Sequence, residues 1–149
     1  EVAESGVPKN DRPHTPVFVL ATAGMRLLPE ADQQEILKIT CEELQLKTDF
    51  YLPECQSHVS IIDGETEALY GWISLNYLMG SFNSQENEIH SNTEPTSFGF
   101  MDMGGASIQI AFSPNSTETE RHLNDLYNVR LRNLNGNNQE WKVFGIRCQ

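Results

Sequence analysis

The sequence predicts an α/β fold in which a small parallel sheet is covered by helices. Residues 16–21 and 58–62 are short apolar runs, largely β-branched, which are typical of buried strands. Each run is followed by a segment with helix-like apolar spacing, over residues 29–47 and 65–78. Strands and helices alternating in this order favour parallel strands joined by helical crossovers.

In the first half of the chain, short signals mark where each helix begins. The first strand ends at residues 22–24, whose small side chains allow a sharp turn, and Pro29 then opens the first helix. Asp63 and Gly64 turn the second strand into the second helix. Five apolar residues of that helix are expected to line one broad face: Leu69, Trp72, Ile73, Tyr77 and Leu78.

The last third of the chain favours antiparallel strands. Residues 97–102 and 108–112 flank a Gly-rich tip and are expected to form a β-hairpin, because the second run alternates apolar and polar residues. Residues 122–134 and 141–144 are expected to add a third and a fourth strand. The polar segment before the hairpin, residues 80–96, is typical of a linker between two lobes.

The chain is strongly acidic, with a formal net charge of −11 over 149 residues. Nucleic-acid binding is therefore not expected, whereas a nucleotide substrate is compatible with this charge because a metal cation and backbone amides can hold phosphate. The longest charge-free run, residues 68–85, is interrupted by Gly, Ser and Asn and is not expected to span a membrane. Because the chain opens with Glu1 and shows no signal peptide, we expect it to be a piece of a longer protein.

Cysteine usage and one tripeptide point to an oxidising compartment. Cys41, Cys55 and Cys148 lack metal-ligand spacing, and their odd number leaves at least one thiol free or paired outside the chain. Asn115 opens an Asn-Ser-Thr sequence, the acceptor pattern for N-glycosylation, in what is expected to be a surface loop. Together these features favour a lumenal or extracellular location. The sequence does not decide which cysteines pair.

The most informative chemistry lies in the predicted hairpin. Asp102 ends its first strand and can hold a metal ion, directly or through water. The glycines that follow let backbone amides approach phosphate oxygens, and Ser107 can donate to a phosphate or orient a water molecule. An ordinary Gly-rich hairpin with a solvated acid is an equal alternative for this segment alone.

Two further segments can complete a phosphate site. Residues 22–24 follow a strand, which is where ligands commonly bind in α/β sheets, although a turn selected for packing explains them as well. Glu65 and Glu67 lie at the start of a helix, where carboxylates favour the helix dipole. A carboxylate at the same place can act as a general base on a water molecule that attacks phosphorus.

These segments resemble three motifs of the nucleoside triphosphate diphosphohydrolases, or apyrases, in the family's order. Residues 21–28 (ATAGMRLL) match the second motif, residues 63–78 (DGETEALYGWISLNYL) the third and residues 102–110 (DMGGASIQI) the fourth. Met25 and Ala106 favour the apyrase branch over the guanosine-diphosphatase branch, and the fungal-type Golgi branch is the expected parent.

The resemblance implies an actin-like, ribonuclease-H-like two-lobed ATPase fold that binds nucleotide between its lobes. Of this fold the chain would contain the end of lobe one (residues 1–89), a linker (residues 90–96) and the start of lobe two (residues 97–149). It also implies a Golgi or other secretory-pathway lumen, with membrane anchoring only through segments outside this chain.

The activity that the resemblance implies is metal-dependent hydrolysis of nucleoside tri- or diphosphates, with Ca²⁺ or Mg²⁺ as cofactor. Glu67 would be the general base, and Asp102 would hold the metal through its water shell. Ser107 and Gln109 would position the attacking water. The residues expected to bind nucleotide phosphate are Thr22, Ala23, Gly104, Gly105, Ala106, Ser107 and Gln109.

The chain also departs from the family pattern. Ala68 stands where the family has Gly after the base, a change that a helix tolerates. The first and fifth motifs lie outside the chain, which a truncated or mis-spliced gene model would explain, and we expect the chain by itself to have little or no activity. Two alternatives stay open: another actin-like phosphotransferase, against which the segment from Glu67 to Trp72 argues, and a protein that binds nucleotide without hydrolysing it.

Overall fold

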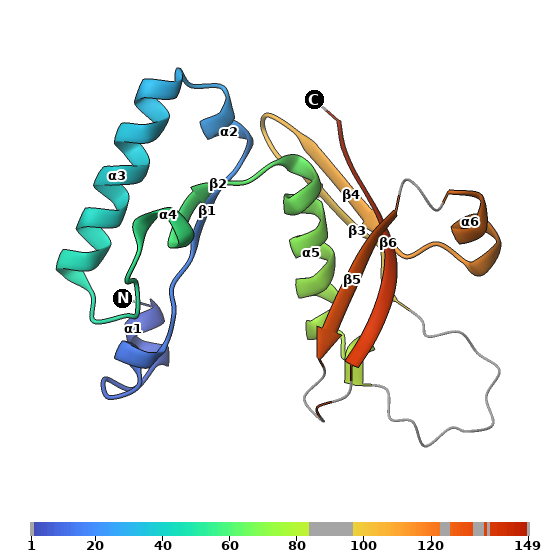
Figure 1. Cartoon of the computed structure of the whole chain (residues 1–149), viewed down its shortest axis with the longest axis horizontal. Helices are drawn as coiled ribbons and strands as arrows, with labels where there is room; N and C mark the ends of the chain where they lie inside the picture. Colours follow the sequence, from blue (N-terminus) through green and yellow to red (C-terminus); the bar gives the residue numbers. More distant parts are fainter. Residues whose placement is uncertain (1, 84–96, 123–125, 133–135, 137, 149) are drawn as a thin grey trace. The chain divides into compact units, whose positions relative to one another are not determined.

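The structure, a computed structural model, describes residues 2–83, 97–122, 126–132, 136 and 138–148. The chain divides into two compact units, Glu1–Ile62 (unit 1) and Asp63–Gln149 (unit 2), and each is described by itself (Figure 1).

Unit 1 is a small α/β layer. β1 and β2 pair in parallel, with Val19 opposite Val59, which confirms the predicted parallel arrangement. The elements of unit 1 are α1 (Val2–Gly6), the 3-10 helix η1 (Arg12–His14), β1 (Val19–Ala21), α2 (Ala23–Arg26), α3 (Glu30–Lys47), α4 (Cys55–His58) and β2 (Val59–Ile61).

The long helix α3 lies where it was predicted, but the second strand begins one residue later than expected. His58 ends the short helix α4 instead of opening β2. Its ring is buried, stacks on Phe18 at 4.6 Å between centroids and has Nδ1 2.8 Å from the Val17 carbonyl oxygen. These contacts come from a distant part of the chain, so the local β-branched pattern could not reveal them.

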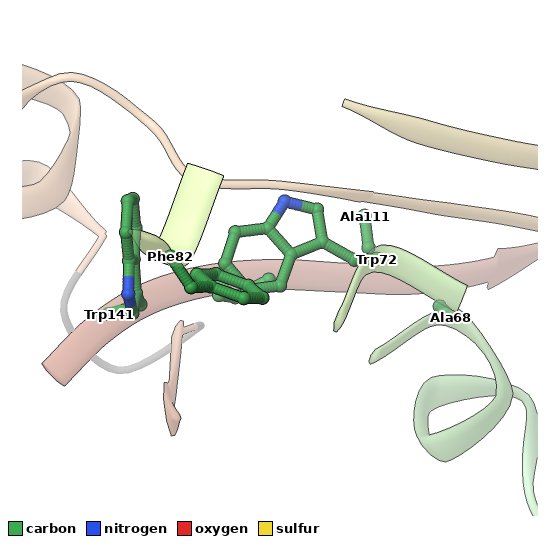
Figure 2. Packing of buried hydrophobic residues seen from close by; sticks show 6 residues of the cluster. Ala68, Trp72, Phe82, Ala111 and Trp141 are labelled. Carbon is green, nitrogen blue, oxygen red and sulfur yellow. The ribbon is translucent and has the colours of Figure 1, made fainter. Parts of the chain in front are cut away.

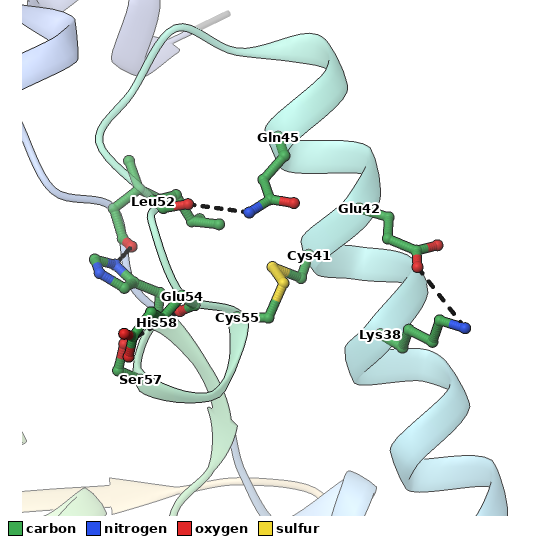
Figure 3. The surroundings of a disulfide bond; sticks show 10 residues. Lys38, Cys41, Glu42, Gln45, Leu52, Glu54, Cys55, Ser57 and His58 are labelled. Carbon is green, nitrogen blue, oxygen red and sulfur yellow. Dashed lines mark hydrogen bonds and ion pairs between the residues drawn. A yellow bond between two sulfur atoms is a disulfide. The ribbon is translucent and has the colours of Figure 1, made fainter.

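A disulfide bond joins Cys41 of α3 to Cys55 of α4 (Figure 3). Cys41 is fully buried and forms the core of unit 1 together with Leu52 and Val59. The end of α3 is also tied to the following segment by Gln45, whose Nε2 donates to the Leu52 carbonyl at 3.1 Å. The bond resolves the pairing that the sequence left open.

Unit 2 is a four-stranded antiparallel sheet with a helix packed on one face. The strand order is β3-β4-β6-β5. The predicted hairpin and both later strands are confirmed, and α6 stands where a surface loop was expected. The elements are α5 (Gly64–Leu78), the 3-10 helix η2 (Ser81–Asn83), β3 (Phe100–Met103), β4 (Ile108–Phe112), α6 (Ser116–Arg121), β5 (Leu126–Arg132) and β6 (Asn138–Cys148).

The chain divides after Ile62, and α5 belongs to unit 2 because it packs on the sheet of that unit. Trp72 of α5 is fully buried and contacts Phe82 and Trp141, with its ring centroid 5.7 Å from each of theirs (Figure 2). Tyr77 and Leu78 were expected on this buried face but are exposed, so that part of the helix prediction was wrong. The predicted linker, residues 90–96, lies outside the described residues.

Gly71 allows a close approach between α5 and the sheet. A Cβ atom at this position would lie 2.2 Å from the Phe100 ring, well inside van der Waals contact. We expect Gly71→Ala to destabilise the chain by about 1–3 kcal/mol in urea unfolding, because overpacking outweighs the gain in helix propensity.

Two comparisons test this explanation. The loss should shrink in a Phe100→Leu background, because Leu lacks the ring atoms nearest the new methyl group. Gly6→Ala in α1, where a Cβ meets nothing within 4 Å, should not destabilise the chain. Equal losses for Gly71→Ala in both backgrounds would show that Phe100 is not the cause.

Candidate functional site

In unit 1, Thr22 and Ala23 occupy the turn at the carboxyl end of β1. Thr22 is the N-cap residue of α2, and its carbonyl accepts a hydrogen bond from the Met25 amide at 3.0 Å. Its side chain makes no capping hydrogen bond to the helix. Ala23 is buried under the turn. The turn therefore has the compact shape expected from its small residues, at the strand end where α/β sheets commonly bind ligands.

Arg26 of α2 connects this turn to the end of the neighbouring strand, β2. Its Nη1 donates to the Ile62 carbonyl at 2.5 Å, and the Ile62 amide donates to the Ala21 carbonyl at 3.0 Å. Both contacts lie at the carboxyl edge of the β1–β2 sheet. The sequence analysis did not single out Arg26, because no spacing rule links it to a residue 36 positions away.

In unit 2, the β3–β4 hairpin carries the predicted metal and phosphate residues. Asp102 pairs directly with Gln109, and the Gly104 amide closes the tip by donating to the Ser107 carbonyl at 2.9 Å. Asp102 is exposed, as are the three tip residues Gly104, Gly105 and Ala106. The hairpin thus presents an acid and a short exposed backbone segment beside each other.

Below the tip, Ser107 and Gln109 form a buried polar pair. Gln109 is 1% exposed, Ser107 is 7% exposed, and Gln109 Nε2 donates to Ser107 Oγ. Alternation along β4 puts both residues on one face of the sheet, and Asp102 shares that face because it is the direct cross-strand partner of Gln109. Phe100 and Ala111 belong to the same face, which α5 covers.

The helix α5 begins with a side-chain cap that Asp63 supplies, so neither Glu65 nor Glu67 is needed as the cap. Asp63 is the N-cap, and its Oδ1 accepts from the Thr66 amide at 2.7 Å. Glu65 and Glu67 lie in the first turn and are half-buried. The capping role allowed for them by the sequence therefore belongs to Asp63, although their charges still favour the helix dipole.

Contacts at two levels define how α5 lies along the start of β3. Asn76 hydrogen-bonds to Phe98, and Gly71, five residues earlier on the helix, contacts Phe100, two residues later on the strand. Five helical residues rise about 7.5 Å and two strand residues about 7 Å, so helix and strand run antiparallel with matched spacing.

The contact between Gly71 and Phe100 also indicates where the candidate catalytic residues lie. Glu67 lies four residues before Gly71, one turn away on the same side of the helix, which is about 6 Å along its axis. Asp102 lies two residues beyond Phe100, about 7 Å along the strand. Glu67 and Asp102 therefore both lie towards the end of unit 2 at which α5 begins and the β3–β4 hairpin turns (Figure 1).

The structure thus gathers most of the predicted site residues in unit 2. Glu67, Asp102, Ser107 and Gln109 share the α5 side of the sheet, with the tip residues beside them, whereas Thr22 and Ala23 belong to unit 1. Among the described residues, no group of three or more His, Cys, Asp and Glu side chains can ligate a metal. A single exposed carboxylate such as Asp102 suits Mg²⁺ or Ca²⁺, because these ions also take water and phosphate oxygens as ligands.

The fold is that of a mixed α/β protein, with a parallel two-stranded sheet in unit 1 and an antiparallel four-stranded sheet in unit 2. A family model described as GDA1/CD39 (nucleoside phosphatase) family matches residues 1–147, and the chain belongs to this family.

Three relatives illustrate its similarity within the family. The Golgi apyrase of Saccharomyces cerevisiae is 46% identical over 145 residues, which are 97% of this chain and 22% of the relative. The Golgi apyrase of Schizosaccharomyces pombe is 35% identical over 97% of this chain and 24% of its own length. The nucleoside-diphosphatase mig-23 of Caenorhabditis elegans is 39% identical over 88% of this chain and 24% of its own length. The chain therefore spans about a quarter of the length of these relatives.

Proposed function

We propose that this chain contributes the catalytic base and metal-binding residues of a nucleoside phosphohydrolase, which releases phosphate from nucleoside tri- or diphosphates. The packing of α5 on the face of the sheet that carries Asp102, Ser107 and Gln109 supports this proposal, because a base for water and a ligand for a metal must flank the same phosphate. The names of the relatives, which include apyrases and a nucleoside-diphosphatase, support this substrate class.

In the proposed reaction, Glu67 accepts a proton from a water molecule as the water oxygen attacks the terminal phosphorus. The bond from phosphorus to the bridging oxygen breaks, and that oxygen leaves with the nucleoside di- or monophosphate. Asp102 would hold Ca²⁺ or Mg²⁺ through water, and the cation would neutralise charge on the phosphate oxygens.

The remaining residues bind and orient the reactants. Ser107 and Gln109 can position the water, because their buried hydrogen bond fixes both side chains. Backbone amides at residues 104–106 and at the turn formed by Thr22 and Ala23 would hold phosphate oxygens. For the whole protein we propose the two-lobed actin-like fold, with unit 1 in the first lobe and the sheet of unit 2 in the second.

The test is phosphate release from ATP, ADP, UDP and GDP with Ca²⁺, Mg²⁺ or excess chelator. The assay uses a chimaeric enzyme in which this chain replaces the 145 matched residues of the Saccharomyces cerevisiae Golgi apyrase. We expect turnover that requires a divalent cation, and little turnover from the 149-residue chain by itself. A folded chimaera that binds nucleotide but releases no phosphate would instead favour the binding-only alternative.

We also propose a place in the Golgi lumen, which the similarity to Golgi apyrases supports. Membrane anchoring would depend on other segments. Within the described part of the chain, no helix is both long and apolar enough to cross a membrane.

The same location makes Asn115 a candidate for N-glycosylation. Asn115 is exposed and caps α6, its Oδ1 accepting from the Glu118 amide at 2.9 Å, so a glycan on Nδ2 leaves the cap intact. We expect the chain made in a secretory pathway to lose mass on treatment with an N-glycosidase. Asn115→Asp should abolish that loss while retaining the helix cap. If the chain that contains Asn115 keeps the same mass after N-glycosidase treatment, the assignment is contradicted.

A further inference from the structure

Asn76 is fully buried in α5, and its side-chain amide makes three hydrogen bonds to described residues. Its Nδ2 donates to the Trp72 carbonyl and to the Phe98 carbonyl, both at 2.9 Å. Its Oδ1 accepts from the Phe98 amide at 2.7 Å. Asn76 thus bonds both the backbone amide and the backbone carbonyl of Phe98, a residue 22 positions later in the chain. We call this pair of bonds the Asn76 clamp.

The clamp acts where the sheet itself gives the least support. In the described sheet β3 lies at the edge and pairs only with β4, and its ladder begins at Phe100. Phe98 precedes that ladder. The contact of Gly71 with Phe100 is apolar and has no directional preference, whereas the hydrogen bonds of Asn76 have a fixed direction. The clamp is therefore a direct and directional contact that can fix the register of β3 along α5.

We propose that Asn76 is a positioning residue, which holds β3 in register along α5 and so keeps Asp102 on the face of the sheet that α5 covers. Its catalytic consequence rests on the proposed function. A slip of one residue would move Asp102 by about 3.4 Å along the strand and turn its side chain to the other face of the sheet. Such a slip would separate the metal ligand from the base without touching either residue.

Asn76→Ser tests the clamp in the 149-residue chain. A Ser hydroxyl can still bond to the carbonyl four residues earlier, that of Trp72, but is too short to reach Phe98. We expect hydrogen exchange at the Phe98 amide to accelerate at least tenfold, while amides paired between β5 and β6 keep their protection. Unchanged protection at Phe98 would overturn the proposal. If the Ser variant does not fold, Asn76→Asp keeps the volume and the acceptor while removing both donated bonds.

The chimaeric enzyme described above then separates positioning from mere stability. Displaced supporting residues at metal sites typically cost about 10–100-fold in metal affinity or activity. We expect Asn76→Ser to raise the Mg²⁺ or Ca²⁺ concentration that gives half-maximal rate at least tenfold, with the nucleotide KM within about twofold. Val143→Ala, in the same core, is the control that destabilises the unit but leaves the half-maximal cation concentration unchanged.

The two levels of the proposal fail in different ways. The positioning role would be overturned if Asn76→Ser lowered the rate only in proportion to the folded fraction. In that case the half-maximal cation concentration would be unchanged. An inactive but folded chimaera that still contains Asn76 would count against the proposed function. In that case, hydrogen exchange at the Phe98 amide would still test the structural role of the clamp.

Discussion

Replacing Glu67 with Gln should lower the phosphate-release rate of the chimaeric enzyme about 10²–10⁴-fold, the usual contribution of a general base. Gln has the size and shape of Glu, but its amide cannot take the proton of the attacking water at neutral pH. Nucleotide binding should change little, because Glu67 is proposed to act on water and not on the phosphates. Phosphate release measures the first effect, and titration with a non-hydrolysable nucleotide measures the second.

Glu65 provides a matched control for this variant. It lies two residues earlier in the same helical turn, is also half-buried and carries the same charge near the helix N-terminus. Glu65→Gln should keep the rate within about threefold, because a charge in the first turn is worth only about 0.3–1 kcal/mol. If Glu65→Gln abolishes turnover and Glu67→Gln does not, Glu65 is the general base and Glu67 is not.

The sequence was sufficient for the elements whose signals are local. Pro29 and the acidic first turn marked the start of α3, and the Gly-rich tip between alternating residues marked the β3–β4 hairpin. The short helices were missed for a physical reason. A single turn such as α4 is stabilised by tertiary contacts, here the disulfide and the buried His58 ring, and not by its own pattern.

Helix α6 was missed because one signal supported two interpretations. Asn115 in a polar stretch indicates a surface loop, but the same side chain is also a favourable helix N-cap. Tyr77 and Leu78 show a related limit. Apolar residues at helical spacing predicted a broad buried face, yet the core already closes around Trp72 with Phe82 and Trp141, and both residues remain exposed.

For the candidate site, the sequence predicted residue types but not their register. Glu67 and Asp102 were selected by chemistry and by the family resemblance, and no local pattern relates a helix to a strand that begins 22 residues after it ends. The relation depends on Asn76 and Gly71, both of which are helix residues without an obvious catalytic type. A buried Asn on an apolar helix face was the one available signal, because a buried amide must find partners.

Removing the disulfide should have the largest effect on stability. The bond closes a loop between residues 14 apart, for which chain-entropy arguments give about 3 kcal/mol. Unit 1 has little else to replace it, since its described buried apolar cluster consists of Cys41, Leu52 and Val59. Cys41→Ala/Cys55→Ala should lower the melting temperature of unit 1 by roughly 12–24 °C, because 1 kcal/mol corresponds to about 4–8 °C in a domain of this size.

Calorimetry with and without dithiothreitol measures this loss. Reductant should lower the melting temperature of the unchanged chain and of the Cys148→Ala control, and should leave the double variant unaffected. Equal melting temperatures for the oxidised and reduced chain would show that the bond does not stabilise unit 1. If the expected difference is found, it also bears on location: cytosolic thiols keep such cysteines reduced, so unit 1 would reach its full stability only in an oxidising compartment such as the secretory lumen.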